Sequence, residues 1–249
     1  MIVCKSAAEL EKMRAAGRVV ARVLDAVSAR VAPGVTTLEL EAVAEKEIAA
    51  AGAQPAFKGY HGYPCVLCTS VNDEVVHGIP SERKLQAGDV VSIDVGVKLD
   101  GFFADAATTV ALEPVRPEVQ KLLQVTREAL EKAIAAMRPG ASLADVSEAV
   151  QRHVEANGFG VVREFVGHGI GRALHEDPPI PNFGPPQMGP RLEAGMVLAI
   201  EPMVTMGGHE VEVLGDGWTA VTKDRSLAAH FEHTIAITDR GTEVLTSLT

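Results

Sequence analysis

Cysteine, aromatic residues and long uncharged stretches are all scarce in this sequence. Its 249 residues include three cysteines, one tryptophan and two tyrosines, and aromatic residues make up 4% of it. Three cysteines are too few for a disulfide framework and are typical of a reducing compartment. No uncharged apolar run approaches the roughly 18 residues of a membrane-spanning helix. The first residues, MIVCKSAAELEKMR, carry charges at short intervals, so we expect no signal peptide and a cytoplasmic protein without membrane contact.

Basic residues are also in deficit. Lysine and arginine number 23 against 33 acidic residues, which gives a net charge of −10. Such a chain offers no broad surface for a phosphate backbone, so we expect no direct nucleic-acid function. The hydrophobic share of 47% and the charged share of 22% are those of an ordinary globular protein, with one large domain or two small ones.

Two of the cysteines form a C-x-x-C pattern, Cys65 and Cys68 in PCVLCTSV. The second pair that would complete a zinc site is missing from the sequence. In an extended segment this odd spacing places the two thiols on opposite faces. We therefore expect structural or pocket-lining cysteines, in preference to redox or metal chemistry.

Two apolar segments each carry an acid where a hydrophobic residue would pack. AGDVVSIDVGV contains Asp94, and EAGMVLAIEPM contains Glu201 in a matching frame. An ionised carboxylate alone in an apolar interior is very costly, so such a group is normally paired or metal-bound. The two acids therefore call for a common explanation.

The two halves of the chain repeat the same order of elements. Helix signals begin at Ser6-x-x-Glu9, Thr36-x-x-Glu39, Pro117 and Ser142-x-x-Asp145, and the four helices end near Pro33-Gly34, Gly52, Pro139-Gly140 and Gly158. Strand-like sequence follows each helix pair, and the caps recur 106 positions apart. Pro-Gly turns and Ser or Thr helix caps are common in proteins, so the matches between the halves could also be coincidental. We favour a repeat: one domain, 1–249, with pseudo-symmetric halves at about 10–112 and 117–245.

A hairpin in the first half brings a second acid to Asp94. Asp100-Gly101 is a strong signal for a two-residue loop between strands. That loop places Asp94 and Asp105 on one face as diagonal neighbours, about 7–8 Å apart at the backbone. From there two carboxylates can converge on one metal ion or bridge two.

The second half offers a similar set. Glu201 and Glu232 lie on strand-like segments that would pair, and His168 lies in VGHGIGRALHE. Arg172 replaces the third glycine of a G-x-G-x-x-G pattern, so a nucleotide loop is a weak interpretation. For His168 alone, a metal ligand and an ordinary hydrogen-bonded histidine remain equally open. Four acids with one imidazole suit Mn, Fe(II), Co or Zn better than a structural calcium cluster.

The motifs VSIDVGV, GFFADAATTV, GHGIG, LAIEPM and FEHT are similar, in order and spacing, to the metal-ligand set of type I methionine aminopeptidases. The resemblance covers essentially the whole chain. It implies the α/β (α+β) pita-bread fold, a pseudo-two-fold repeat of helices packed on a curved, mainly antiparallel sheet. The implied activity is that of a dinuclear metallohydrolase, which removes the initiator methionine from nascent polypeptides when the next residue is small.

The resemblance also implies a role for individual residues. The ligands of two divalent ions (Co, Mn, Fe(II) or Zn) would be Asp94, Asp105, His168, Glu201 and Glu232. Glu201 would also carry a proton, His175 would stabilise the attacked carbonyl, and His77 would position the peptide. The substrate-binding residues would be Tyr60, Tyr63, Cys68, His77, His175 and Trp218.

Three positions depart from the commoner pattern of that family, namely Phe57, Leu174 and His230. They affect the expected shape of the pocket and leave the chemistry unchanged. Two alternatives remain, an X-Pro aminopeptidase or prolidase of the same fold and a non-catalytic pita-bread binding protein. The first usually has an added N-terminal domain, and the second would be expected to lose metal ligands. The expected partners are peptides with N-terminal methionine and, transiently, the ribosome, and the expected state is a monomer.

Overall fold

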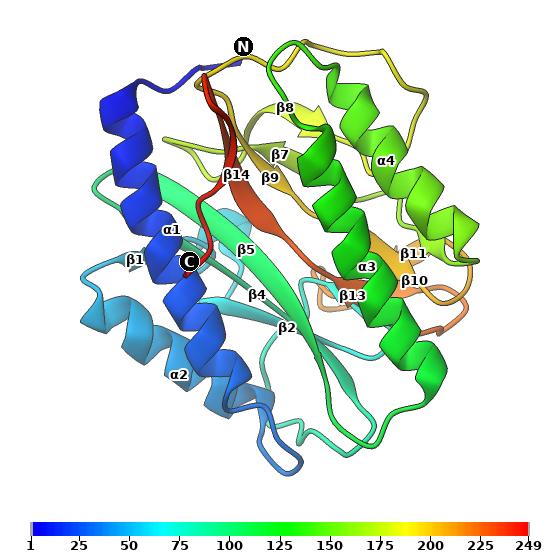
Figure 1. The fold of residues 1–249 in the computed structure, drawn as a ribbon. Coiled ribbons are helices and arrows are strands. Elements are labelled where there is room, and N and C mark those ends of the chain that lie inside the picture. Colours follow the sequence, from blue (N-terminus) through cyan, green and yellow to red (C-terminus); the bar gives the residue numbers. More distant parts are fainter. Residues whose placement is uncertain (1, 249) are drawn as a thin grey trace.

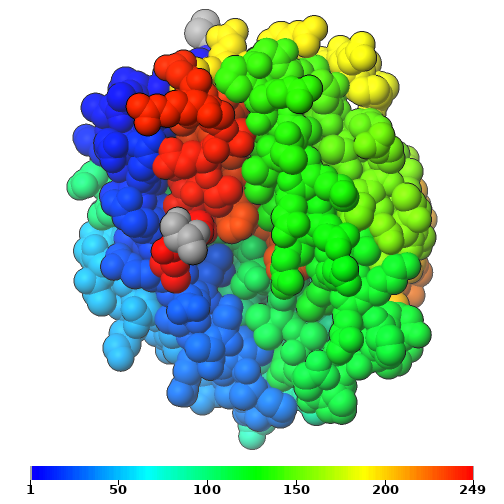
Figure 2. Space-filling model, viewed as in Figure 1, coloured from blue at the N-terminus to red at the C-terminus, as the bar shows by residue number. Residues whose placement is uncertain are grey.

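The computed structural model describes residues 2–248, so the two end residues of the expected domain lie outside it. Four long helices cover one side of the strands (Figure 1), and they are α1 (Ala7–Ser28), α2 (Thr37–Ala50), α3 (Pro117–Ala136) and α4 (Leu143–Ala156). Figure 2 shows α1 in blue and α3 in green on the same face, with C-terminal residues in red between them. Within residues 2–248, no helix is both long and apolar enough to cross a bilayer.

The helices begin where the sequence predicts. Capping boxes are present at Ser6, Thr36 and Ser142, and Pro117 occupies the first turn of α3. Each helix ends a few residues before the expected Pro-Gly or Gly signal. After the first helix, the N–H of Gly34, at φ +91°, donates to Leu85 O at 2.8 Å. The four predicted helices are therefore confirmed, with earlier ends.

The sheet of the first half is antiparallel. It consists of β1 (Gln54–Pro55), β2 (Leu67–Val71), β4 (Val90–Leu99) and β5 (Phe102–Ala111), with β4 paired to the other three. Asp100 and Gly101 form the loop between β4 and β5, with φ values of 49° and 85°. Gly96 consequently lies opposite Asp105, as the hairpin signal predicts.

The largest sheet of the second half has the order β15-β14-β9-β7-β8 and is also antiparallel. Its strands are β7 (Gly167–Gly169), β8 (Glu176–Ile180), β9 (Val197–Ile200), β14 (His233–Thr238) and β15 (Gly241–Val244). Two three-stranded sheets complete the fold. They contain β3 (Glu74–Val76), β6 (Gly160–Val161), β10 (Met203–Thr205), β11 (Val211–Val213), β12 (Ala220–Thr222) and β13 (Ala228–His230), and a short 3-10 helix, η1 (Tyr60–Gly62), precedes β2.

The same backbone hydrogen bonds recur in both halves. Gly34 N–H donates to Leu85 O at 2.8 Å, and Gly140 N–H donates to Leu192 O at 2.8 Å. Each half also has its own apolar core, one between α1, α2 and β4 and the other between α3, α4, β9 and β14. The repeat inferred from the sequence is thus present as repeated geometry, with two cores under two helix pairs.

The halves meet where β5 lies beside residues 230–234. We call this pairing the inter-half contact. Ala107 N–H donates to Glu232 O at 3.3 Å, and Glu232 N–H donates to Ala107 O at 2.9 Å. The Thr109 hydroxyl lies 2.6 Å from His230 O and accepts from His230 N–H at 2.9 Å. This pairing places the acid of β5 next to the acid that precedes β14.

The Thr234 hydroxyl extends the inter-half contact at its other end. It donates to Asp105 O at 2.7 Å and accepts from Asp105 N–H at 3.0 Å. Thr234 is fully buried, so these bonds are made away from water. The backbone around Asp105 is therefore held by the second half of the chain as well as by β4.

Candidate metal centre and substrate pocket

The five residues expected to bind metal lie around one cavity of about 140 Å³. Asp94 lies on β4, Asp105 on β5 and His168 on β7, while Glu201 directly follows β9 and Glu232 directly precedes β14. The two halves therefore contribute to one site. Its formation depends on the hairpin register and on the inter-half contact.

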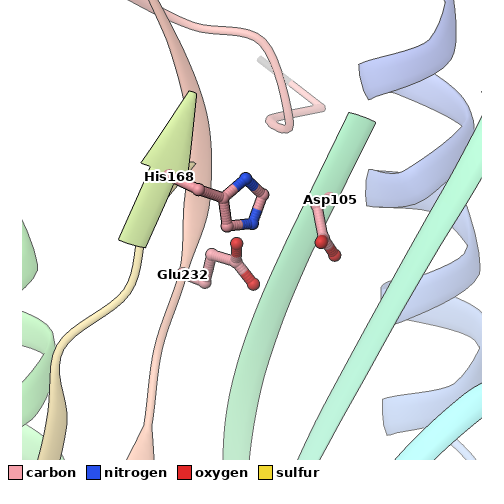
Figure 3. Close-up of side chains that lie close together, drawn as sticks. All are labelled: Asp105, His168 and Glu232. Atoms are coloured by element: carbon pink, nitrogen blue, oxygen red, sulfur yellow. The ribbon is translucent and has the colours of Figure 1, made fainter. Parts of the chain in front are cut away.

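Three of these side chains approach most closely. Ligand atoms of Asp105, His168 and Glu232 all lie within 4.8 Å of one another. Figure 3 shows the three side chains pointing toward a common space from three separate segments. All three are buried, with exposed fractions of 5%, 6% and 2%. A single ion between them would contact all three.

The acids of the cluster oppose one another's ionisation. Burial raises the pKa of Asp105 to about 7, although a hydrogen bond with Asp94 acts in the other direction. Burial and then the Asp105 carboxylate raise the pKa of Asp94 and of Glu201 well above their ordinary ranges. The same two causes raise the pKa of Glu232. Four ionised carboxylates can share this space only if positive charge is buried with them.

Unsatisfied oxygen atoms indicate where that charge belongs. Within residues 2–248, Asp94 Oδ1, Asp105 Oδ1 and Glu232 Oε1 are buried and accept no hydrogen bond. A buried acceptor without a partner is costly, and a divalent cation would satisfy all three at once. Carboxylate oxygens with one imidazole are also a donor set that Mn, Fe(II), Co or Zn accept. The residues present thus fit a divalent metal site.

His168 is prepared to act as a neutral ligand. Its Nδ1 lies 2.8 Å from the carbonyl oxygen of Gly169, which can only accept, so Nδ1 carries the proton. Burial and then the nearby His175 lower the pKa of His168 to about 3. Its Nε2, 3.7 Å from Glu201 Oε1, therefore presents a lone pair and forms no ion pair at neutral pH.

Another part of the cavity lining is apolar. It is formed by Phe57, Tyr60, Tyr63, Cys68, Leu174 and Trp218. These side chains pack in one cluster, in which the rings of Tyr63 and Trp218 lie edge to face with centroids 5.1 Å apart. The expected pocket residues are thus brought together, and Cys65, expected on the other face from Cys68, lies outside the lining.

Two histidines lie between the acids and the apolar wall. His175 Nδ1 lies 2.8 Å from the Tyr60 hydroxyl, and its ring stacks on that of Tyr60. The His175 ring centroid is also 4.1 Å from that of His168. His77 packs edge to face against Trp218, and burial lowers the pKa of His77 to about 4. Both histidines are therefore neutral at pH 7, since burial lowers the pKa of His175 as well.

The structure adds residues for which the sequence gave no expectation. Thr109 and Thr234 hold the inter-half contact, and Phe165 packs edge to face on His77, with centroids 5.3 Å apart. The spacing of two between Asp105, Ala107 and Thr109 could have indicated Thr109, because alternate strand residues share a face.

His230 is 1% exposed, and its Nε2 lies 3.8 Å from Glu201 Oε2.

Comparison with known proteins gives a consistent result. The model of metallopeptidase family M24 matches residues 11–239. A methionine aminopeptidase of Clostridium perfringens is 51% identical over 246 residues, which are 99% of this chain and 99% of that protein. This chain belongs to metallopeptidase family M24. In this M24 protein the acids, His168 and the apolar wall are therefore parts of a metallopeptidase.

Solved structures extend the comparison to the fold of this M24 protein. The crystal structure of methionine aminopeptidase from Thermotoga maritima matches with a TM-score of 0.98 and 50% identity. The match covers 99% of this chain and 100% of the Thermotoga chain. Prolidase from Pyrococcus furiosus has a TM-score of 0.81 at 22% identity, covering 99% of this chain and 66% of that one. The second likeness shows the fold alone. The expected pita-bread fold is confirmed.

Proposed function

We propose that this protein is a metal-dependent methionine aminopeptidase that removes the initiator methionine from nascent polypeptides when the next residue is small. The observation that carries the proposal is the cavity itself. Acids and neutral histidines line one part of it, and aromatic and thiol side chains line another. Full-length relatives that carry this name support the same activity. Prolidases share only the fold, so the X-Pro alternative is not favoured.

We further propose that residues 1–249 form a single catalytic domain with halves at about 10–112 and 117–245. The recurring hydrogen bonds of Gly34 and Gly140 support the division. Each half supplies part of the cavity lining, so neither half alone would be active.

The metal ligands are proposed to be Asp94, Asp105, His168, Glu201 and Glu232. The unsatisfied oxygens of Asp94, Asp105 and Glu232, and the free Nε2 of His168, support this assignment. Asp105 and Glu232 belong, with His168, to the closest group of ligand atoms, so these three residues would hold a divalent ion together. Divalent ions bound there supply Lewis-acid polarisation of the scissile carbonyl and activation of a water molecule.

The protein's own groups bind, orient and move protons. Burial raises the pKa of Tyr60, so its hydroxyl stays protonated, and we assign it as the donor to His175 Nδ1, 2.8 Å away. The ring proton of His175 is then on Nε2, where it can donate to the oxygen that gains charge when the carbonyl is attacked. Glu201 accepts a proton from water and returns it to the leaving amine. His77 orients the peptide at the cavity edge.

The apolar wall selects the side chain of the first residue. Tyr60, Tyr63, Cys68 and Trp218 offer aromatic and soft sulfur contacts that suit a thioether. The Tyr63 hydroxyl lies 3.0 Å from Leu67 O and 3.1 Å from Gly78 O, which fixes the ring. A rigid wall of this kind favours unbranched methionine over charged or β-branched side chains.

The proposed substrates are nascent peptides with N-terminal methionine. The protein would bind them in the cytoplasm, in transient contact with the ribosome. The proposed state is a monomer, since both halves of the site come from one chain. No membrane or direct nucleic-acid role is proposed, in line with the net charge of −10.

Release of methionine from Met-Ala-Ser tests the function. The purified protein is chelated, then assayed with added Mn or Co beside an X-Pro peptide. Metal-dependent release from Met-Ala-Ser alone is expected. Cleavage confined to the X-Pro peptide would assign the protein to the prolidase type, and no cleavage with metal bound would favour the binding-protein alternative.

A further inference from the structure

The loop between β7 and β8, residues 170–175, carries Leu174 and His175 into the cavity. Its shape depends on the carboxylate of Glu176, the first residue of β8. Glu176 Oε1 accepts from the backbone N–H groups of Arg172 and Ala173 at 2.7 and 3.1 Å. The loop is thus closed on itself directly beside His175.

The second oxygen of the same carboxylate faces a residue far away in the sequence. Lys5 Nζ lies 2.6 Å from Glu176 Oε2, and the exposed fractions of the two side chains are 4% and 17%. Burial acts to raise the pKa of Glu176, but Lys5 and the loop N–H groups outweigh it and lower that pKa. The contact is therefore an ion pair that is shielded from water.

Lys5 is held by a backbone hydrogen bond and packs closely against two glycines. Its backbone N–H donates to Gly195 O at 2.7 Å, and Ser6 begins α1 immediately afterwards. A Cβ on Gly171 would lie 2.4 Å from Lys5 Cε, and a Cβ on Gly195 would lie 2.8 Å from Lys5 O. Glycine at these two places is what lets the lysine reach the loop.

A buried ion pair is a poor source of net stability, because desolvation offsets most of the attraction. Its geometric effect is more specific, since it fixes the carboxylate on which the loop closes. The loop holds His175 from one side, and Tyr60 holds its Nδ1 at 2.8 Å from the other. Displacing a catalytic group by 1 Å can lower the reaction rate by about 100-fold.

We propose that Lys5 and Glu176 are positioning residues for His175, holding the loop so that its imidazole meets the attacked carbonyl. The N-terminal segment before α1 is thereby part of the catalytic apparatus. The proposal rests on the proposed aminopeptidase function. The proposal concerns kcat, because neither Lys5 nor Glu176 lines the cavity in which methionine and metal would bind.

A nearby exposed ion pair provides a matched control. Arg172 Nη2 lies 2.9 Å from Glu9 Oε1 and also links the loop to α1, but the Arg172 side chain is 69% exposed. Exposed pairs contribute little because water and salt screen them. Arg172→Ala should therefore leave kcat within about twofold of the wild type.

The first test is Lys5→Met, which keeps the length of the side chain and removes its charge. We expect kcat for Met-Ala-Ser to fall by about 10- to 100-fold, with KM and the calorimetric affinity for Mn unchanged. Lys5→Arg should recover part of kcat. If Lys5→Met does not fold, Glu176→Gln replaces it, since one oxygen remains for the loop N–H groups. Failure of both to fold would assign the pair to stability and overturn the proposal.

The second test separates positioning from a general structural effect. Lys5→Met is combined with His175→Ala, and the loss of kcat is compared in the two backgrounds. A positioning role predicts no further loss once His175 is absent. An equal loss in both backgrounds, or a wild-type kcat for Lys5→Met, would refute the proposal. A wild-type protein that releases no methionine would instead refute the proposed function.

Discussion

At the scale of single residues, Asp105 occupies the centre of the site. It belongs to the closest group of ligand atoms, its Oδ1 is unsatisfied, and its backbone is bonded to Thr234. Burial raises the pKa of Asp105 to about 7, so only a nearby cation keeps it ionised at lower pH.

Asp105→Ala should abolish turnover and weaken metal binding, because it removes a carboxylate from the closest group of ligand atoms. Methionine release and calorimetric titration with Mn are the measurements. Asp25→Ala, at an exposed position of α1 and away from the cavity, serves as the control. Near-normal activity of Asp105→Ala would contradict the ligand assignment.

His175→Ala should lower kcat by about 100- to 1000-fold with little change in KM, since its hydrogen bond is made mainly when charge develops.

Tyr60→Phe removes the donor to Nδ1 and should cost about tenfold in kcat, the value of one hydrogen bond. Steady-state kinetics on Met-Ala-Ser check both. An effect of His175→Ala confined to KM would argue against its proposed role.

At the scale of elements, the β4–β5 hairpin sets the relation between Asp94 and Asp105. Its two loop residues both have positive φ, which glycine adopts freely and other residues adopt at a cost. The register that follows is the one that places both carboxylates on one face. An error of one residue would turn one of them away.

Gly101→Ala should lower the free energy of unfolding by about 1–2 kcal/mol, because alanine is strained at a φ of +85°. This corresponds to a Tm lower by about 2–8 °C for a chain of this size. Gly215→Ala is the matched control, since Gly215 has an ordinary φ and nothing within 4 Å of an added Cβ. Equal Tm values for the two variants would contradict the strain argument.

At the scale of the whole molecule, the metal-free protein buries several acids with raised pKa values. A carboxylate whose pKa is raised on folding favours the folded state at low pH, and that contribution is lost as pH rises through the folded pKa. For Asp105 the window runs from its ordinary value of 3.8 to about 7. The pKa of buried His77 is lowered to about 4, so it acts in the opposite sense, but only below its ordinary value of 6.5.

Between pH 6.5 and about 7 we therefore expect the Tm of the chelated protein to fall as pH rises, since Asp105 still loses its proton there and the opposing effect of His77 ends at 6.5. Added Mn or Co should raise Tm, and more strongly at higher pH, because metal binding requires deprotonated ligands. Thermal melts with and without chelator at several pH values are the measurement. A chelated protein whose Tm rises with pH would contradict this account.

Much of the fold could be predicted because the deciding signals are local. Ser6, Thr36 and Ser142 mark helix starts through contacts within one turn, and Asp100-Gly101 marks a hairpin through its own backbone preference. The frames of Asp94 and Glu201 indicated a shared buried site from the cost of isolated charge alone. The roles of the individual ligands were inferred by resemblance and stay predictions.

Sequence by itself determined the four helices, the β4–β5 register and the presence of acids in apolar strands, since each follows from interactions between near neighbours. Tertiary structure alone decided the rest. The pairing of β5 with residues 230–234 and the reach of Lys5 to Glu176 join segments more than a hundred residues apart. Such contacts depend on how two separately packed cores meet, and no local pattern in the chain encodes that meeting.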